Sequence, residues 1–416
     1  MRKKTFFGVR MSSLIVTGGK RLSGEISVSG SKNAALPLIF STIAIDGVST
    51  FFDVPDIDDV RVALKIIEAF GAEITSAGNK LVIDTRNLKY AEPPSFLVEK
   101  LRASTYLLGA MLARFGKAKL YNFGGCNFCE RPIDMHLSAI NSLGGTQDGI
   151  FFYAKELIGC DIFFEKASVG ATINALIMAS AAKGVTRIFG YAREPHVLAL
   201  VRFLRSAGIK ISCRGACLEV EGGRAVGGKV RVIPDMIEAG TYIVLSLLTD
   251  SELLIKGVDA GHLSALLTLL SGAGAHFKID EEGIIPLGKI TKPISVITEP
   301  YPGFPTDLQP QTAPLLAAFS GGRITEGVWQ GRFGYLSELK KLGLRCEVSD
   351  DTAVILPSAL KCGETRAPDL RGGAAILLSA LYTEGKSEIK NAECIFRGYE
   401  NLILKLNSVG ALIERI

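Results

Sequence analysis

The chain has few of the features that build disulfide frameworks, membrane helices or nucleic-acid-binding tails. Its eight Cys are too sparse in 416 residues for a disulfide framework. No apolar run approaches the ~18 residues of a membrane span, and the longest covers residues 34–45. The net charge is only +5, from 47 basic and 42 acidic residues, and the cations are scattered instead of forming a basic tail or helix. This distribution favours anionic small molecules over nucleic acids or membranes as partners.

Signals for metal binding and export are also weak. Cys126-x-x-Cys129 and Cys213-x-x-x-Cys217 have no second pair at zinc-ribbon spacing, and the four His are far apart. We therefore predict no structural zinc and no other metal. The N-terminus, MRKKTFFGVRMSS, is basic but has no apolar stretch behind it, so we read no secretory signal and expect the chain in the cytoplasm. Residues 1–11 are expected to be a disordered extension, with Met11 as an alternative start.

What the chain does contain is a sixfold repeat. A composition with 48% hydrophobic residues and 45 Gly fits a soluble globular protein with many tight turns. Six segments each consist of an amphipathic helix, a glycine and a short apolar strand. We expect each glycine to adopt the left-handed conformation that ends many helices. The six glycines are 64 to 73 residues apart: Gly71, Gly144, Gly208, Gly274, Gly343 and Gly410.

A second, more apolar helix precedes each amphipathic one. The six segments are KNAALPLIFSTIAI, LRASTYLLGAMLARF, VGATINALIMASAA, IEAGTYIVLSLL, LQPQTAPLLAAFS and DLRGGAAILLSALY. Helices that are apolar on nearly every side are buried ones, so each unit reads as strand, buried helix, strand, surface helix, strand. Because a single core stops growing near ~250–300 residues, we predict an α/β fold of two domains. Each contains three repeated β-α-β-α-β units, with helices inside and sheets outside.

The repeats also predict the domain boundaries. The first three-repeat domain is expected to span 31–232, and the second 12–30 plus 233–416. The strand at 24–29 is taken to begin the first unit, and the strand at 13–17 to supply the edge missing from the sixth. The chain then crosses between the domains near residues 30 and 233. Ligands favour the cleft between such domains.

Several cations lie at equivalent places near the start of a helix. Helix N-termini carry free N–H groups and partial positive charge, so they attract anions. A single one of these cations is more often a solvated surface charge, but six in register favour an anionic substrate with phosphate or carboxylate groups. The six are Lys32, Arg102, Lys166 and Arg371 before the buried helices, with Arg131 and Arg397 before the other set.

Two further side chains are candidates for chemistry. Cys126 follows Phe123-Gly124-Gly125 and shortly precedes Arg131, a setting that exposes a thiol and lowers its pKa; an inert buried Cys is the alternative. Asp307, in PGFPTDLQPQ, lies on a turn at a helix start. It is either a general base or a plain helix cap, which is the commoner use of Asp there.

At this point a family resemblance is evident. The ordered motifs SGSKNAALPL, LRAST, GGCNFCERPIDMH, SVGAT, AREP, FPTDLQPQ, RF, DLRGG and RGYE resemble those of the UDP-N-acetylglucosamine 1-carboxyvinyltransferase family. The resemblance runs from about Val16 to the C-terminus. It implies the enolpyruvyl transferase fold of two inside-out α/β barrel-like domains. It also implies transfer of the enolpyruvyl group of phosphoenolpyruvate to the 3′-hydroxyl of UDP-N-acetylglucosamine, with release of phosphate, the first committed step of peptidoglycan synthesis.

The resemblance also implies residue roles. Cys126 is similar to the family's proton-donating loop cysteine, which the antibiotic fosfomycin alkylates, and Asp307 to the carboxylate that takes the hydroxyl proton. The phosphoenolpyruvate site is implied at Lys32, Asn33, Arg131, Arg371 and Arg397, with Lys32 and Arg397 also catalytic. The nucleotide site is implied at Arg102, Arg131, Pro132, Ile133, Asp134, Met135, Lys166, Ala167, Ser168, Val169, Asp307 and Val328. No cofactor, metal or obligate protein partner is implied.

Five positions depart from the family pattern: Tyr106, His196, Met236, Gln330 and Gly331. They put binding strength or loop closure in question more than reaction type. Two alternatives stay open. One is a shikimate-using enolpyruvyl transferase, which shares the phosphoenolpyruvate residues but is disfavoured by the Cys126 segment and SVGAT. The other is a catalytically idle paralogue that binds the sugar nucleotide.

Overall fold

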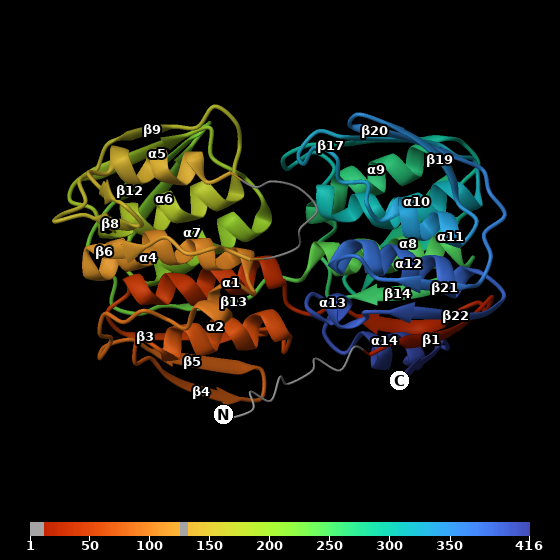
Figure 1. Cartoon of the computed structure of the whole chain (residues 1–416), viewed down its shortest axis with the longest axis horizontal. Coiled ribbons are helices and arrows are strands. Elements are labelled where there is room, and N and C mark those ends of the chain that lie inside the picture. The colour runs from red at the N-terminus through yellow and green to blue at the C-terminus, as the bar shows by residue number, and fades with distance from the viewer. Residues whose placement is uncertain (1–11, 125–131) are drawn as a thin grey trace, which may run out of the picture.

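The computed structural model describes residues 12–124 and 132–416, and it consists of two halves that lie side by side (Figure 1). Each half has its own hydrophobic core. One core is built from buried residues between Ala34 and Val232, and the other from residues between Leu14 and Ile26 together with residues between Ile237 and Ile413. Cys126, Cys129 and Arg131 lie outside the described residues.

Within residues 12–124 and 132–416, six largely buried helices form the interior of the two halves. In α12 every residue from Leu370 to Leu381 is buried, which agrees with its nearly uninterrupted apolar sequence. Helix α4 packs on α6, and α10 packs on α12. The six are α1 (Lys32–Ser41), α4 (Tyr106–Phe115), α6 (Val169–Ala181), α8 (Met236–Leu248), α10 (Gln309–Ala318) and α12 (Leu370–Tyr382).

A second set of helices has one exposed face, and one of the repeat glycines follows two or three residues after the end of each helix. All six glycines have φ between 87° and 115°, a conformation that a Cβ disfavours, so the expected left-handed helix ends are confirmed. These helices are α2 (Asp58–Glu68), α5 (Asp134–Ser142), α7 (Pro195–Ser206), α9 (Ser264–Gly272), α11 (Leu336–Lys341) and α14 (Leu402–Ser408). Shorter helices are α3 (Ser95–Val98), α13 (Glu393–Phe396) and the 3₁₀ segments η1 (Thr42–Ala44), η2 (Arg102–Thr105), η3 (Ala260–Leu263) and η4 (Thr306–Leu308).

In the part of the chain that the structure describes, six small sheets cover the helices (Figure 1). Three of these sheets belong to the N-terminal half, and the strands of each are given in their order across the sheet. The first is β13 (Lys229–Arg231), β3 (Val48–Phe52), β5 (Lys80–Asp84), β4 (Glu73–Ala77); the second is β6 (Lys117–Lys119), β8 (Phe151–Tyr153), β7 (Thr146–Asp148); the third is β11 (Lys210–Arg214), β12 (Cys217–Glu221), β10 (Val185–Phe189), β9 (Asp161–Phe163). The other three belong to the C-terminal half. The first is β15 (Ala275–Ile279), β16 (Gly283–Gly288), β14 (Glu252–Lys256), β2 (Ser23–Ser27); the second is β17 (Ile294–Thr298), β18 (Gly322–Glu326), β20 (Thr352–Leu356), β19 (Arg345–Ser349); the third is β21 (Glu364–Arg366), β22 (Gly385–Lys390), β1 (Leu14–Gly18), β23 (Leu412–Arg415).

The halves exchange one strand in each direction, which corrects one expectation. The strand expected at 24–29 to begin the first unit is β2, and it pairs in parallel with β14 in the C-terminal half. Its place beside β3 is taken by β13. In three other sheets the parallel edge strand precedes its own buried helix: β9 before α6, β17 before α10 and β21 before α12. At β2 and β13 the chain instead leaves for the other half directly after the strand.

The two crossings lie against each other. Ser31 N donates to Ile233 O at 2.7 Å, and Asp235 N donates to Ser29 O at 2.9 Å. A Cβ on Gly30 would lie 1.9 Å from Asp53 O, so the close approach of the first crossing to the residue that follows β3 requires glycine. The strand expected to supply the missing edge of the sixth unit is β1. It belongs to that unit's sheet, but it lies inside the sheet, between β22 and β23 and antiparallel to both.

Candidate active site

The first crossing leads directly into α1 and so positions Lys32. The Asp235 carboxylate caps α8 by accepting from Ile237 N at 2.8 Å and Glu238 N at 3.1 Å. Its other oxygen accepts from Lys32 N at 3.2 Å. Asp235 therefore links the starts of α1 and α8, the buried helices that follow the two crossings.

Lys32 and Arg397 meet at a nearly buried carboxylate. Asp59 is in the first turn of α2, and its side chain is 7% exposed. Its Oδ2 lies 3.5 Å from Lys32 Nζ, and its Oδ1 accepts from Arg397 Nε at 2.8 Å. Arg397 Nη2 also donates to Lys100 O at 2.9 Å. Arg397 follows α13 in the C-terminal half, whereas Lys32, Asp59 and Lys100 are in the N-terminal half, so the cluster joins the two halves.

Asp307 lies between two arginines that are almost completely buried. Its Oδ1 accepts from Arg332 Nη1 at 3.0 Å, and its Oδ2 accepts from Arg371 Nη2 at 3.1 Å and Nε at 3.3 Å. Burial opposes ionisation of this carboxyl, but the charges of Arg371, Arg332 and Lys32 outweigh it and hold the pKa of Asp307 well below its ordinary value. The group is therefore a carboxylate at neutral pH.

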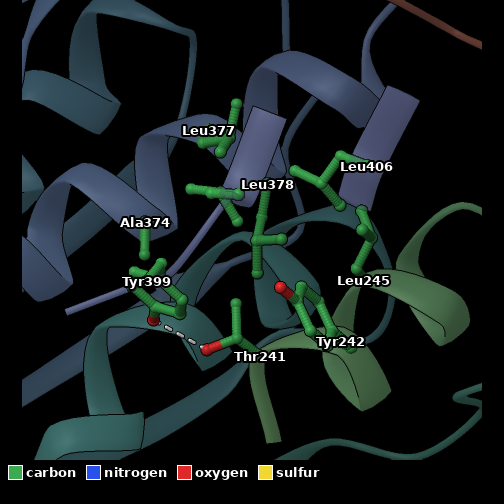
Figure 2. A pocket seen from close by; sticks show the side chains of 9 residues that line it. Thr241, Tyr242, Leu245, Ala374, Leu377, Leu378, Tyr399 and Leu406 are labelled. Carbon is green, nitrogen blue, oxygen red and sulfur yellow. Dashed lines mark hydrogen bonds between the residues drawn. The ribbon is translucent and has the colours of Figure 1, made fainter. Parts of the chain in front are cut away.

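Arg371 also contacts Tyr399, which is buried in the core of the C-terminal half. Its guanidinium lies 5.6 Å from the centroid of the Tyr399 ring, a cation–π distance. The Tyr399 hydroxyl is hydrogen-bonded to Thr241 Oγ1 at 2.9 Å (Figure 2), and Gln311 Nε2 donates to it at 3.2 Å. The cavity in Figure 2 is about 10 Å³ in volume and lined mainly by leucines. This is room for one water at most, so the cavity is a packing void and no substrate site.

A second cluster of predicted residues surrounds His136 in α5. The ring is 5% exposed, and burial, aided by the charge of Arg102 and opposed by Asp134, lowers the pKa of His136 to about 4. A Cβ on Gly170 would lie 2.8 Å from His136 Nε2, so the start of α6 packs on this ring. There Ser168 accepts from Ala171 N at 3.3 Å and caps α6. The second cluster therefore gathers Arg102, Asp134 and the 168–169 segment.

The other predicted positions are placed less closely by direct contacts. Val328 N donates to Glu326 Oε1 at 2.9 Å, and Glu326 Oε2 accepts from Thr306 Oγ1 at 2.8 Å, which links Val328 to the segment of Asp307. His196 is the second residue of α7. Burial lowers its pKa, and the charges of Glu194, Asp235 and Asp307 oppose that shift, which places the ring near Asp307. Pro132, Asp134 and Lys166 are exposed, whereas Asn33, Ile133, Met135, Ala167 and Val169 are half-buried.

Sequence reasoning missed two members of this arrangement. Asp59 is an acidic residue in the first turn of an amphipathic helix. Acidic residues are common there because they stabilise the helix dipole, so the sequence alone did not mark Asp59 as a site residue. Arg332 is part of the RF motif, yet it was not assigned a role; its side chain is 5% exposed and bonds Asp307. Asp59 gains its importance from Arg397, 338 residues away, and Arg332 from Asp307, 25 residues away.

Comparison with known proteins identifies the family. The family model described as EPSP synthase (3-phosphoshikimate 1-carboxyvinyltransferase) matches residues 16–406. The chain belongs to the EPSP synthase family. A UDP-N-acetylglucosamine 1-carboxyvinyltransferase of Halothermothrix orenii is 39% identical over 414 residues, with 98% of this chain and 100% of the relative covered. Another protein of that name, from Geobacillus kaustophilus, is 38% identical over 97% of both chains.

Solved structures agree on the fold of this EPSP synthase family member. The enolpyruvyl transferase NikO from Streptomyces tendae superposes with a TM-score of 0.88 at 28% identity, over 98% of this chain and 99% of that one. The EPSP synthase of Acinetobacter baumannii gives a TM-score of 0.73 at 19% identity, which supports the fold alone. The predicted enolpyruvyl transferase fold and the resemblance to UDP-N-acetylglucosamine 1-carboxyvinyltransferases are thus confirmed.

Within 12–124 and 132–416, no three or more His, Cys, Asp or Glu side chains group as metal ligands. In the same ranges no helix has the length and apolar character needed to cross a membrane.

Proposed function

We propose that this protein transfers the enolpyruvyl group of phosphoenolpyruvate to the 3′-hydroxyl of UDP-N-acetylglucosamine and releases phosphate, as the first committed step of cytoplasmic peptidoglycan synthesis. The observation that carries the proposal is the placement of Asp307. This carboxylate accepts hydrogen bonds from Arg371 and Arg332, and the charge of Lys32 also lowers its pKa. A proton acceptor surrounded by cations suits the reaction of an anionic substrate with a neutral hydroxyl.

The reaction adds and then eliminates. The sugar oxygen bonds C2 of the enolpyruvyl group while C3 gains a proton; the C2–O bond to phosphate then breaks, and C3 loses a proton. Positive charge grows at C2 as the hydroxyl proton leaves, so a carboxylate beside the attacking oxygen stabilises this step. We assign that role to Asp307, and proton donation at C3 to Cys126, as the family resemblance implies.

The low pKa of Asp307 makes it a hydrogen-bond acceptor before it can be a base. While both arginines neutralise it, the carboxylate orients the hydroxyl but is a weak proton sink. The phosphate and carboxylate of phosphoenolpyruvate compete for Arg371, whose bonds to Asp307 are 3.1 and 3.3 Å. As the substrate draws this arginine away, the basicity of Asp307 rises. Binding of phosphoenolpyruvate thus activates the base.

The remaining roles divide between the two clusters. We assign phosphoenolpyruvate to Lys32, Asn33, Arg131, Arg371 and Arg397. For the nucleotide we propose the residues around His136, with Arg102 as a phosphate-binding cation, and Lys166 to Val169 at the start of α6. The proton transfers at the sugar hydroxyl and at C3, together with neutralisation of the departing phosphate by cations, are sufficient for this addition and elimination. The mechanism therefore needs no metal or redox cofactor.

Closure of the cleft completes the proposal. We infer that residues 31–232 and residues 12–30 plus 233–416 act as two domains, because each half has its own core and the chain crosses between them twice. Residues for the nucleotide come mostly from the first half, and Asp307, Arg371 and Arg397 come from the second. The substrates therefore bind between the halves and draw them together.

The test is phosphate release by purified protein with phosphoenolpyruvate and each acceptor in turn. Release with UDP-N-acetylglucosamine, and none with shikimate 3-phosphate, supports the proposal. The shikimate derivative is the acceptor named in the family description, so the reverse preference would overturn it. Calorimetric binding of the nucleotide without any phosphate release would instead identify an idle paralogue.

A further inference from the structure

Asp59 is an acidic residue inside a site proposed to bind a trianionic substrate. Its carboxylate contacts two of the cations assigned to phosphoenolpyruvate, with Arg397 Nε at 2.8 Å and Lys32 Nζ at 3.5 Å. A carboxylate repels phosphate and carboxylate groups, so its presence among these cations calls for a reason.

Stabilisation of the α2 dipole does not supply that reason. Asp58 begins the same helix, and its side chain is 60% exposed and paired with Arg61. A solvated acidic residue is enough to complement a helix N-terminus. Asp59 is only 7% exposed, and burial of a carboxylate costs free energy unless cations compensate it. The compensation here comes from both halves of the molecule.

The geometry at Arg397 indicates what Asp59 does. The guanidinium is planar and rigid, so bonds at two of its nitrogens define its plane. Asp59 binds Nε, and Lys100 O binds Nη2 at 2.9 Å. Both acceptors belong to the N-terminal half, and Lys100 is two residues before Arg102 of the second cluster. An arginine of the C-terminal half is thus oriented by the half that carries the proposed nucleotide site.

We propose that Asp59 is a positioning residue that assembles the phosphoenolpyruvate clamp across the two halves, by holding Lys32 and Arg397 beside each other and setting the plane of the Arg397 guanidinium. Without this carboxylate, two cations in a poorly solvated site repel each other. Arg397 then loses the bond at Nε that helps to fix the plane of its guanidinium, and binding of phosphoenolpyruvate must orient this side chain again. The proposal rests on the function proposed above.

The test compares Asp59→Asn with Asp58→Asn, its neighbour in the same helical turn. For Asp59→Asn we expect kcat/KM for phosphoenolpyruvate to fall at least tenfold, while KM for UDP-N-acetylglucosamine stays within twofold. Asp59→Glu, which restores the charge, should recover part of the loss. Asp58→Asn should match the wild type in both constants.

A double-mutant cycle separates positioning from general damage. If Asp59 acts through Arg397, then adding Asp59→Asn to Arg397→Ala should cost at least threefold less in kcat/KM for phosphoenolpyruvate than it costs in the wild type. Full additivity, equal losses for both substrates, or tighter phosphoenolpyruvate binding by Asp59→Asn would each overturn the proposal. The last result would make Asp59 a competitor that substrate displaces.

Calorimetric titration with phosphoenolpyruvate alone keeps this test separate from the proposed reaction. If the wild type turns over but Asp59→Asn binds phosphoenolpyruvate as tightly as the wild type, only the role of Asp59 fails. If the wild type releases no phosphate with UDP-N-acetylglucosamine, the proposed function fails first, whatever the titrations give.

Discussion

Acidification should destabilise this protein through His136, and the size of the effect follows from the structure. Asn174 Nδ2 lies 2.7 Å from His136 Nδ1 and 3.1 Å from Thr105 O, while Asn174 Oδ1 accepts from Gly109 N at 2.8 Å. The carbonyl of Thr105 and the N–H of Gly109 together orient the amide so that its NH₂ faces the ring. His136 Nδ1 must therefore accept, which only a neutral ring can do with its proton on Nε2.

The cost of charging this ring sets the magnitude. The pKa of His136 falls from 6.5 to about 4 because of burial and the charge of Arg102. Each pKa unit corresponds to about 1.4 kcal/mol, so the effect is roughly 3 kcal/mol. The unfolded chain takes up this proton as the pH falls below about 6.5, whereas the folded protein does so only near pH 4. The free energy of unfolding should therefore fall by roughly 3 kcal/mol between pH 7 and pH 4 through this group alone.

Urea unfolding at intervals from pH 7 to pH 4 measures the effect. His136→Gln keeps an acceptor for Asn174 but cannot titrate, so its free energy of unfolding should fall by roughly 3 kcal/mol less than that of the wild type. His276→Gln, at an exposed position in β15, is the control and should follow the wild type. His196 and His262, which are both half-buried, are present in all three proteins, so their contributions cancel. Parallel curves for wild type and His136→Gln would refute this reasoning.

Three further predictions concern the site and its scaffold. Asp307→Asn should keep nucleotide binding within a few-fold and lower turnover by roughly 10²-fold or more; near wild-type turnover in a phosphate-release assay would remove Asp307 from the mechanism. Cys126→Asp should retain measurable turnover and resist inactivation by fosfomycin, whereas Cys129→Ser should have the turnover and the fosfomycin sensitivity of the wild type. Peptide mass spectrometry that located the fosfomycin adduct on Cys129 would contradict this. Gly109→Ala should lower the free energy of unfolding by about 2 kcal/mol, because its Cβ would lie 2.5 Å from Asn174 Oδ1. Gly272→Ala, where no atom lies within 4 Å, should not; equal urea midpoints for the two variants would rule out the clash.

Sequence reasoning succeeded where the signal was local. A helix that is apolar on every side, such as α12, carries its burial in its own residues, and a glycine after an amphipathic helix marks a left-handed end. Because Lys32 and Arg371 lie in the first turns of buried helices, their positions followed from the same periodicity. The fold class could be predicted from the sequence for this reason.

Contacts between residues far apart in the chain could not be predicted from the sequence. The residues of β2 favour a strand, but nothing in them indicates whether it pairs with β3 or, as observed, with β14 across the crossing. Asp59 likewise gains its importance from Arg397, 338 residues away. Short strands and single ion pairs depend on how the two halves meet, and periodicity within one repeat contains no information about that.

The central claim is the pairing of phosphoenolpyruvate with UDP-N-acetylglucosamine at Asp307. Its most direct test is mass spectrometry of the sugar nucleotide after incubation with phosphoenolpyruvate, for wild type and Asp307→Asn side by side. The account predicts a UDP-N-acetylglucosamine enolpyruvyl ether from the wild type, in an amount equal to the phosphate released, and roughly 10²-fold less from the variant. Phosphate release without the ether, or equal ether from both proteins, would contradict it.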